Sequence, residues 1–227
     1  MRLPPYFLPR PPLTLDAATV GAFERLFAES VRRGPGAAIE YALAAPKWQL
    51  LCYLCERKNV VLHGSGDPNI AVLEPRKATD AIAFGDREAV YAASDGIWPI
   101  FFAIVDRDRP VRSLVNSCAR VVAPAGAGVP FYFFSIAADD LPGRPWRDGT
   151  VYLLPGETFE RQGSQRYRGL TIETAQVASL TPVRPLAKLA VEPADFPFLE
   201  QVRRHDPEAL RRRAHADPAG FPWLDEP

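Results

Sequence analysis

The chain has 227 residues, 47% of them hydrophobic, which is enough to bury one substantial core in a single domain with helical additions. Lysine and arginine number 27 in total, as do aspartate and glutamate, so no overall field of either sign favours a nucleic acid or a basic partner. Three cysteines do not make a disulfide framework, and no apolar run approaches the roughly 18 residues of a membrane span. We therefore expect a soluble cytoplasmic protein with no membrane partner.

The proline-rich N-terminal arm lacks the apolar run of a signal peptide and precedes a predicted amphipathic helix. Thr14 or Asp16 is suited to cap this helix, and Gly34 is suited to end it. Its apolar residues recur at helical spacing: Val20, Phe23, Phe27 and Val31. A second helical region is predicted from about Ala37. It is interrupted by Pro46, which suits the first turn of a new helix.

From Asn59 onward the sequence changes to short runs rich in β-branched and aromatic residues, separated by turn residues. The predicted strands cover residues 59–63, 89–93, 131–137, 150–155 and 183–191. Helical segments are predicted at residues 94–106 and 196–218. We therefore expect an α+β domain of mostly antiparallel strands, with an N-terminal helical layer and a C-terminal helix.

The strand at residues 59–63 ends in His63, and Gly-Ser-Gly follows at once. Two glycines within three residues let a ligand or another backbone come unusually close, which favours a pocket at the strand end. A lone histidine at a strand end is more often a packing or surface residue. Tyr91 lies in the strand 89–93, and Ser94 or Asp95 is suited to cap the helix that follows. Taken alone, Tyr91 is explained about equally well as an ordinary aromatic residue of a strand and as a functional residue.

His63-Gly64-Ser65 and Tyr91-Ala92-Ala93 together resemble the ADP-ribosyltransferase superfamily, particularly its diphtheria-toxin-like and poly(ADP-ribose) polymerase branch. In that group the first strand ends in His-Gly-Ser or His-Gly-Thr, and the next strand supplies a tyrosine ahead of a helix. A glutamate starts a later strand. Residues 170–191 are similar to the family's last catalytic strand, and they place Glu173 at the position of the glutamate. The competing carboxylates are Glu157 and Glu160.

The resemblance, which covers about residues 60–191, implies an ADP-ribosyltransferase-like fold of split, mostly antiparallel sheets. Residues 58–195 would form the catalytic domain, with residues 1–57 as an arm and helical layer packed on it and residues 196–227 as a C-terminal helix and tail. The resemblance further implies a mono-ADP-ribosyltransferase that uses NAD as co-substrate and transfers ADP-ribose to an unknown acceptor. The alternatives are a toxin-like NAD glycohydrolase and a non-catalytic module that binds NAD or ADP-ribose.

Cleavage of the bond between nicotinamide and ribose builds positive charge on the sugar, which a nearby carboxylate stabilises mainly in the transition state. The resemblance assigns this role to Glu173. It implies that His63 binds a ribose hydroxyl and that the backbone of Gly64 pairs with the nicotinamide carboxamide. It also implies that Tyr91 stacks on the nicotinamide ring, with Phe102 as a second aromatic wall.

Three further residues qualify this interpretation. Ser65 is a binding candidate that is also suited merely to cap its own loop. Arg76 has the guanidinium geometry for an NAD phosphate, although a solvated loop arginine is the plainer explanation. Thr171 stands where arginine-modifying members carry a second carboxylate, which argues against arginine as the acceptor.

Two other patterns have simple structural explanations. Cys52 and Cys55 have C-x-x-C spacing, but Cys118 is the one further thiol, and a complete metal site would need a histidine from His63, His205 or His215. Buried free cysteines and no metal are therefore expected. Arginines gather near the C-terminus at positions 203, 204, 211, 212 and 213. Because acids interrupt them, a solvated helix is expected in preference to a surface for nucleic acid or an acidic partner.

Overall fold

The computed structural model describes residues 4–77, 84–107, 113–123, 126–137, 145–218 and 220–224. Its helices are α1 (Ala17–Arg32), α2 (Lys47–Arg57), α3 (Trp98–Ile104) and α4 (Pro207–Ala216). Its strands are β1 (Leu8–Pro9), β2 (Ala37–Ala38), β3 (Val60–Ser65), β4 (Arg76–Lys77), β5 (Glu88–Ala93), β6 (Leu114–Ala123), β7 (Gly126–Ala127), β8 (Phe131–Ala137), β9 (Gly149–Pro155), β10 (Glu160–Arg161), β11 (Gln165–Tyr167), β12 (Leu170–Thr174), β13 (Gln176–Ser179), β14 (Ala187–Val191) and β15 (Arg203–His205).

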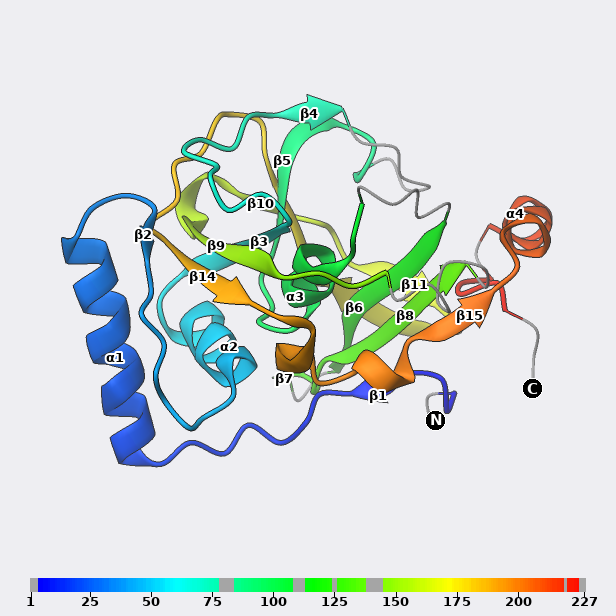
Figure 1. Ribbon diagram of the computed structural model, residues 1–227. Helices are drawn as coiled ribbons and strands as arrows, with labels where there is room; N and C mark the ends of the chain where they lie inside the picture. The colour runs from blue at the N-terminus through cyan, green and yellow to red at the C-terminus, as the bar shows by residue number, and fades with distance from the viewer. Residues whose placement is uncertain are drawn as a thin grey trace.

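The described strands form two sheets in which most neighbours are antiparallel (Figure 1). One sheet has the order β1-β8-β6-β12-β11, with β15 also paired to β8 and β7 to β6. The other has the order β10-β13-β5-β3-β9-β14-β2, with β4 paired to β5. The parallel pairs among the described strands are β14 with β2 and β15 with β8. This arrangement confirms the coarse prediction of an α+β protein with mostly antiparallel strands.

The chain crosses from one sheet to the other at Ala175, between β12 and β13. The Ala175 backbone N–H donates to the oxygen of Cys118 on β6, at 2.9 Å, and its oxygen accepts from the N–H of Ser94, at 2.8 Å. Ala175 therefore contacts both sheets. As a result, β12 belongs to the sheet of β6, whereas β13 belongs to the sheet of β5.

Helix α3 lies at the centre of the molecule (Figure 1), where it packs on β3 and β9. Its Phe101 is fully buried and lies 4.8 Å from the Phe134 ring of β8. Of the two predicted caps, Asp95 bonds to the start of this helix: its Oδ1 accepts the N–H groups of the N-cap residue Ile97 and of Trp98, each at 2.8 Å. Its other carboxylate oxygen accepts the hydroxyl of Tyr132 on β8, at 2.7 Å. One buried carboxylate thus joins the start of α3 to β8.

Helices α1 and α2 lie on one side of the molecule (Figure 1). Asp16 caps α1 by accepting the N–H of Thr19 at 2.7 Å, and Gly34 ends it with a φ of +107°, as predicted. The predicted helical region from Ala37 is wrong before Pro46, because Ala37 and Ala38 form β2, parallel to Ala187 and Lys188 of β14. The new helix predicted at Pro46 is confirmed, since α2 begins at Lys47. Pairing at the edge of a sheet outweighs the helix propensity of alanine here.

The prediction of one helical region over residues 196–218 is wrong for its first half. Arg203 and Arg204 lie on β15, parallel to β8, and α4 begins only after the capping residue Asp206. The reason is a tertiary contact, since His205 is buried with a ring nitrogen 2.7 Å from the hydroxyl of Ser135 on β8. Within the described part of the chain, no helix combines the length and apolar character that crossing a bilayer requires.

Candidate functional site

His63 lies on β3, which pairs with β9 along its whole length and with β5 at Leu62 and Ala93. Its Nδ1 atom is 2.7 Å from the backbone oxygen of Tyr91 on β5. A carbonyl oxygen only accepts, so Nδ1 donates, and the neutral ring keeps Nε2 as an acceptor. Burial lowers the pKa of His63, the bond to Tyr91 opposes this shift, and the charges of Arg107 and Arg76 add to it. The neutral form is therefore favoured.

The two glycines that follow His63 both lie in close contacts within the chain, but only the contacts of Gly64 are with backbone atoms. A Cβ atom on Gly64 would lie 1.9 Å from the backbone oxygen of Pro99 and 2.8 Å from the nitrogen of Ala103, both in α3. A Cβ atom on Gly66 would lie 1.9 Å from a guanidinium nitrogen of Arg147. Gly64 therefore allows α3 to lie against β3, a packing reason that is independent of any ligand. Gly66 allows Arg147 to cover the end of the strand.

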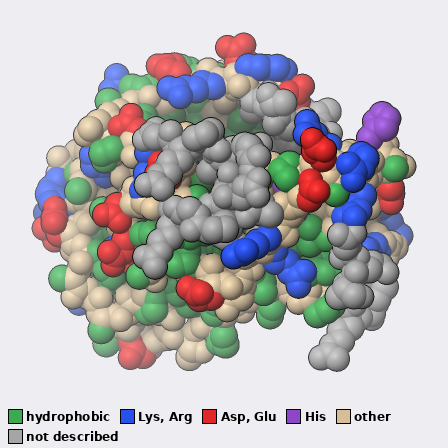
Figure 2. Space-filling model, turned by 45° about the vertical axis from the view of Figure 1, so that its right-hand side comes forward, with side chains coloured by type: hydrophobic (Ala, Val, Ile, Leu, Met, Phe, Trp, Pro, Cys, Tyr) green, Lys and Arg blue, Asp and Glu red, His purple; other side chains and the backbone are tan. Residues whose placement is uncertain are grey.

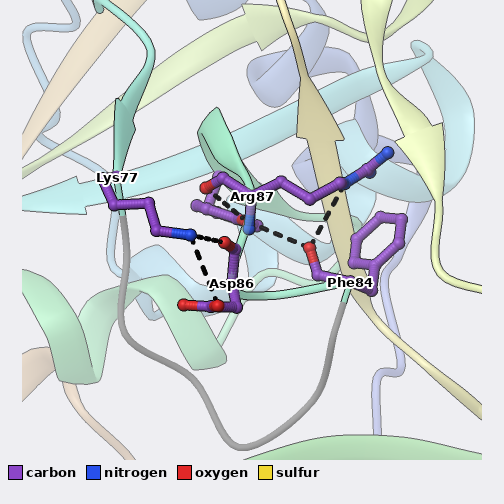
Figure 3. Close-up of polar contacts among 5 residues, drawn as sticks. Lys77, Phe84, Asp86 and Arg87 are labelled. Atoms are coloured by element: carbon purple, nitrogen blue, oxygen red, sulfur yellow. Dashed lines mark hydrogen bonds and ion pairs between the residues drawn. The ribbon is translucent and has the colours of Figure 1, made fainter.

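Tyr91 uses its hydroxyl within its own segment of chain. The phenol oxygen accepts the backbone N–H of Arg87 at 2.9 Å and lies 3.0 Å from the backbone oxygens of Phe84 and Arg87, one of which accepts its proton. Arg87 lies over the ring of Phe84, with the guanidinium carbon 4.3 Å from the centroid, and Lys77 donates to Asp86 beside them (Figure 3). Tyr91 thus offers a ligand its half-buried ring, while its hydroxyl holds the turn that leads into β5.

Arginine side chains gather near His63. Arg107 follows α3, and its guanidinium carbon lies 5.7 Å from the centroid of the Phe102 ring. Burial lowers the pKa of Arg107, and the positive charge of Arg147 lowers it further. Among the described residues, no carboxylate forms an ion pair with Arg107. Arg107 is exposed, and a guanidinium beside another cation favours an anion at this place. Sequence reasoning missed Arg107 and Arg147, because nothing in their local sequence separates them from solvated arginines.

The other predicted binding residues fall into two groups. Phe102 is half-buried on α3 beside Trp98, with ring centroids 5.9 Å apart, and it lies under Arg107. Arg76 is exposed on β4, opposite Ala89 of β5, and it is near enough to His63 to lower its pKa. Ser65 instead caps its own loop, because its hydroxyl accepts the N–H of Asp67 at 3.1 Å.

Glu173 lies on β12, in the sheet that does not contain His63 or Tyr91, opposite Arg120 of β6. The residue opposite Tyr91 is Ala178. Glu173 precedes Ala178 by five residues, so the two lie at most about 17 Å apart, and the chain changes sheets between them. No described side chain forms a hydrogen bond or ion pair with Glu173. The structure thus brings His63 and Tyr91 together, and it leaves Glu173 further along the crossing segment.

The competing carboxylates lie at different levels of the β5 sheet. Glu160 of β10 is opposite Ala178, which is itself opposite Tyr91, so Glu160 shares the row and the face of Tyr91 at about 10 Å, two strand spacings away. Its carboxylate accepts from Arg87 at 3.1 Å. Glu157 lies in the 3-10 turn Gly156–Thr158, next to Asn59 at the end of β3 remote from His63. By register, Glu160 is the better placed of these two.

The strand that adjoins the tyrosine strand begins at Gln176, which is opposite Ala93. It lies two residues from Ala178 and therefore shares the face of Tyr91. The family resemblance calls for a glutamate at the start of a late strand, whereas this strand starts with an amide, which forms hydrogen bonds but carries no charge. Gln162 lies beside it: the side chain is buried, and its Nε2 has no hydrogen-bond partner among the described residues. Sequence reasoning missed Gln176 because its importance depends on strand order.

The described residues contain no group of three or more histidine, cysteine or acidic side chains arranged to hold a metal ion. Cys52 and Cys55 lie on α2 as free cysteines, and burial raises the pKa of both thiols. Both therefore remain protonated thiols at neutral pH.

Comparison with protein-family models, curated proteins and solved structures gives no match for this chain. The resemblance to ADP-ribosyltransferases therefore depends on the residues themselves.

Proposed function

We propose that this chain is an NAD-dependent mono-ADP-ribosyltransferase that binds the nicotinamide riboside between β3 and β5, within an ADP-ribosyltransferase-like fold. The observation that carries the proposal is the contact of His63 with the backbone of Tyr91. It joins the two motif strands and leaves Nε2 of a neutral imidazole free to accept a ribose hydroxyl. The ring of Tyr91 would stack on nicotinamide, with Phe102 as the second wall.

The arginines near His63 supply the charge that a dinucleotide needs. Arg107 and Arg76 would bind the pyrophosphate, because guanidinium groups match phosphate oxygens and these two already act on His63 electrostatically. In the reaction, the bond between nicotinamide and C1 of the ribose breaks, and nicotinamide leaves with the electron pair. The acceptor forms the new bond to C1 and loses a proton. Glu173 remains the proposed stabiliser of the sugar cation, with Glu160 as the competitor.

The test is to incubate the purified chain with NAD and measure free nicotinamide, free ADP-ribose and ADP-ribosylated products by mass spectrometry. A transferase releases nicotinamide in proportion to modified acceptor, and Glu173→Gln abolishes that release. If Glu160→Gln abolishes it and Glu173→Gln does not, Glu160 is the catalytic carboxylate. Free ADP-ribose in stoichiometric amount would identify an NAD glycohydrolase. Absence of nicotinamide release in a cell lysate that supplies acceptors would overturn both enzymatic functions.

A second candidate function is a module that binds NAD or ADP-ribose without cleaving it. The observation that favours it is Gln176, an amide at the start of the strand beside β5 where a carboxylate would stabilise the sugar cation. In this case the wild-type chain binds NAD and releases no nicotinamide, whereas Gln176→Glu gains slow release. Release by the wild-type chain at an enzymatic rate would exclude the module.

A further inference from the structure

A hollow lies between β15 and α4, on the side of the molecule away from α1 and α2 (Figure 1). Its volume is about 190 Å³. Figure 2, in which this side comes forward, shows arginine or lysine side chains, with some acidic ones, near a histidine at the right of the view. The residues of the hollow that bear on binding are Arg203, Arg204, Asp206, Leu210, Arg213 and Trp223.

The charges of this hollow are not balanced by the described residues around it. Arg203 and Arg204 are exposed on β15, and no described carboxylate forms an ion pair with either. Asp206 is the acid of the lining, and its Oδ1 accepts the backbone N–H groups of Glu208 at 2.8 Å and Ala209 at 3.3 Å. These bonds, which lower the pKa of Asp206, direct its charge to the start of α4. Among the described residues that line the hollow, positive charge therefore exceeds negative charge, although the whole chain is neutral.

The aromatic wall of the hollow is held in place by its neighbours. The indole N–H of Trp223 donates to the backbone oxygen of Asp217 at 2.8 Å. The indole ring meets the Phe221 ring edge-on, at 5.3 Å between centroids and 76° between planes. Arg213 of α4 donates to the backbone oxygen of Trp223 at 3.3 Å. The half-exposed indole therefore lies beside α4 in a fixed orientation, with buried Leu210 nearby.

The floor of the hollow is equally fixed. The buried His205 ring has one nitrogen 2.7 Å from the Ser135 hydroxyl and the other 3.0 Å from the Ser113 hydroxyl. These contacts attach β15 to β8 and to the chain just before β6. Ser135 is completely buried, so the His205–Ser135 pair has a structural role and does not supply a nucleophile to the hollow. Arg203 and Arg204 thus extend from a strand that is fixed on its inner side.

We propose that this hollow binds a phosphate monoester attached to a flat ring, which is the chemistry of a nucleotide. Guanidinium groups pair with phosphate oxygens through two parallel N–H donors, and an indole stacks on a base regardless of its identity. The size of the hollow suits one such unit and is too small for an extended strand. The ligand is therefore a free mononucleotide or the 5′-phosphorylated end of a nucleic acid. The site is separate from the one proposed for NAD.

The test is isothermal titration of the full chain with AMP, adenosine and inorganic phosphate. We expect AMP to bind, and adenosine and phosphate each to bind at least about tenfold more weakly, since each lacks one half of the recognised group. The double variant Arg203→Ala, Arg204→Ala should lose at least about tenfold in AMP affinity, and affinity should fall as salt rises. Arg211→Ala, an exposed arginine of α4 outside the hollow, is the matched control and should bind AMP normally.

Three further arms complete the experiment. His63→Asn should leave AMP binding at this hollow unchanged, which separates it from the proposed NAD site. A 5′-phosphorylated oligonucleotide that binds about tenfold tighter than AMP would identify a nucleic-acid end as the source, and equal affinity would identify a free nucleotide. The proposal is overturned if AMP does not bind at about 1 mM. It is also overturned if the double alanine variant binds AMP as tightly as Arg211→Ala does.

The double variant Arg203→Lys, Arg204→Lys keeps the positive charge. If this variant is folded and binds AMP weakly, guanidinium geometry is needed as well as charge.

Discussion

The end of β3 at His63 and the crossing segment at Ala175 are the two regions that bear on the proposed function, and their structures are determined in different ways. At His63 the short motif sets the structure, because a Cβ atom on Gly64 would collide with the backbone of Pro99. At Ala175 strand order sets it, because the chain changes sheets between Glu173 and Gln176. A motif therefore identifies the histidine strand, whereas only the fold shows which residue stands beside the tyrosine strand.

The largest expected effect concerns the motif region. Gly64→Ala places a Cβ atom 1.9 Å from the Pro99 oxygen, so α3 must move, and we expect a loss of about 3 kcal/mol in the free energy of unfolding. Gly163→Ala is the matched control, because nothing lies within 4 Å of its added Cβ atom. Urea unfolding measures both. Equal stability of the two variants would show that α3 does not press on Gly64.

The next effect concerns the junction between the two regions. Asp95→Ala leaves two N–H groups of α3 and the buried hydroxyl of Tyr132 without their acceptor, and we expect a loss of about 2–3 kcal/mol. Asp86→Ala, in the exposed turn before β5, serves as the control and should cost less than about 1 kcal/mol. A chemical unfolding curve for each variant decides this. Similar losses in the two variants would contradict the role given to Asp95.

A smaller effect separates the ring of Tyr91 from its hydroxyl. Tyr91→Phe removes the bonds to Arg87 and Phe84 and should cost about 1 kcal/mol of stability. NAD affinity should be retained in Tyr91→Phe and lost in Tyr91→Ala, because stacking needs only the ring. Titration calorimetry with NAD measures this difference. Loss of affinity in Tyr91→Phe equal to that in Tyr91→Ala would assign the hydroxyl, and not the ring, to the ligand.

The smallest effect is a pH dependence. Because burial lowers the pKa of His63 in the folded chain, the unfolded chain binds a proton more readily as pH falls below the ordinary histidine value of 6.5. The free energy of unfolding that the neutral His63 ring contributes is therefore fully present above pH 6.5 and decreases as the pH falls below 6.5. Unfolding free energies of the wild type and of His63→Asn, measured from about pH 7 to about pH 5, should converge. Parallel curves would mean that His63 ionises freely in the folded chain.

Much of the local structure was predictable from the sequence, since capping residues and strand composition act over short distances. Asp16, Gly34 and Asp95 mark helix ends as expected, and β3, β5, β8, β9 and β14 lie within or next to the predicted runs. The strand β6 was not foreseen, because its apolar residues are interrupted by Asn116 and Arg120 and its pairing with β8 and β12 is entirely long-range.

The candidate site was predictable only in part, because some of its residues are brought together by long-range pairing. His63 and Tyr91 meet through a backbone contact that their order along the chain indicated. Arg107 comes near His63 only because α3 crosses β3, and no local pattern shows that. Gln176 acquires its place from the register of β13 on β5, which depends on a change of sheet one residue earlier.

The central claim is that His63 helps to bind NAD. The most direct test is to measure NAD binding to the wild-type chain and to His63→Asn by titration calorimetry, with an unfolding curve for each. We expect one site in the folded wild-type chain and a loss of about tenfold or more in His63→Asn, whose amide can still donate to Tyr91 but offers no equivalent of Nε2. A folded His63→Asn chain that binds NAD as tightly as the wild type, or a wild-type chain that does not bind NAD, would contradict the claim.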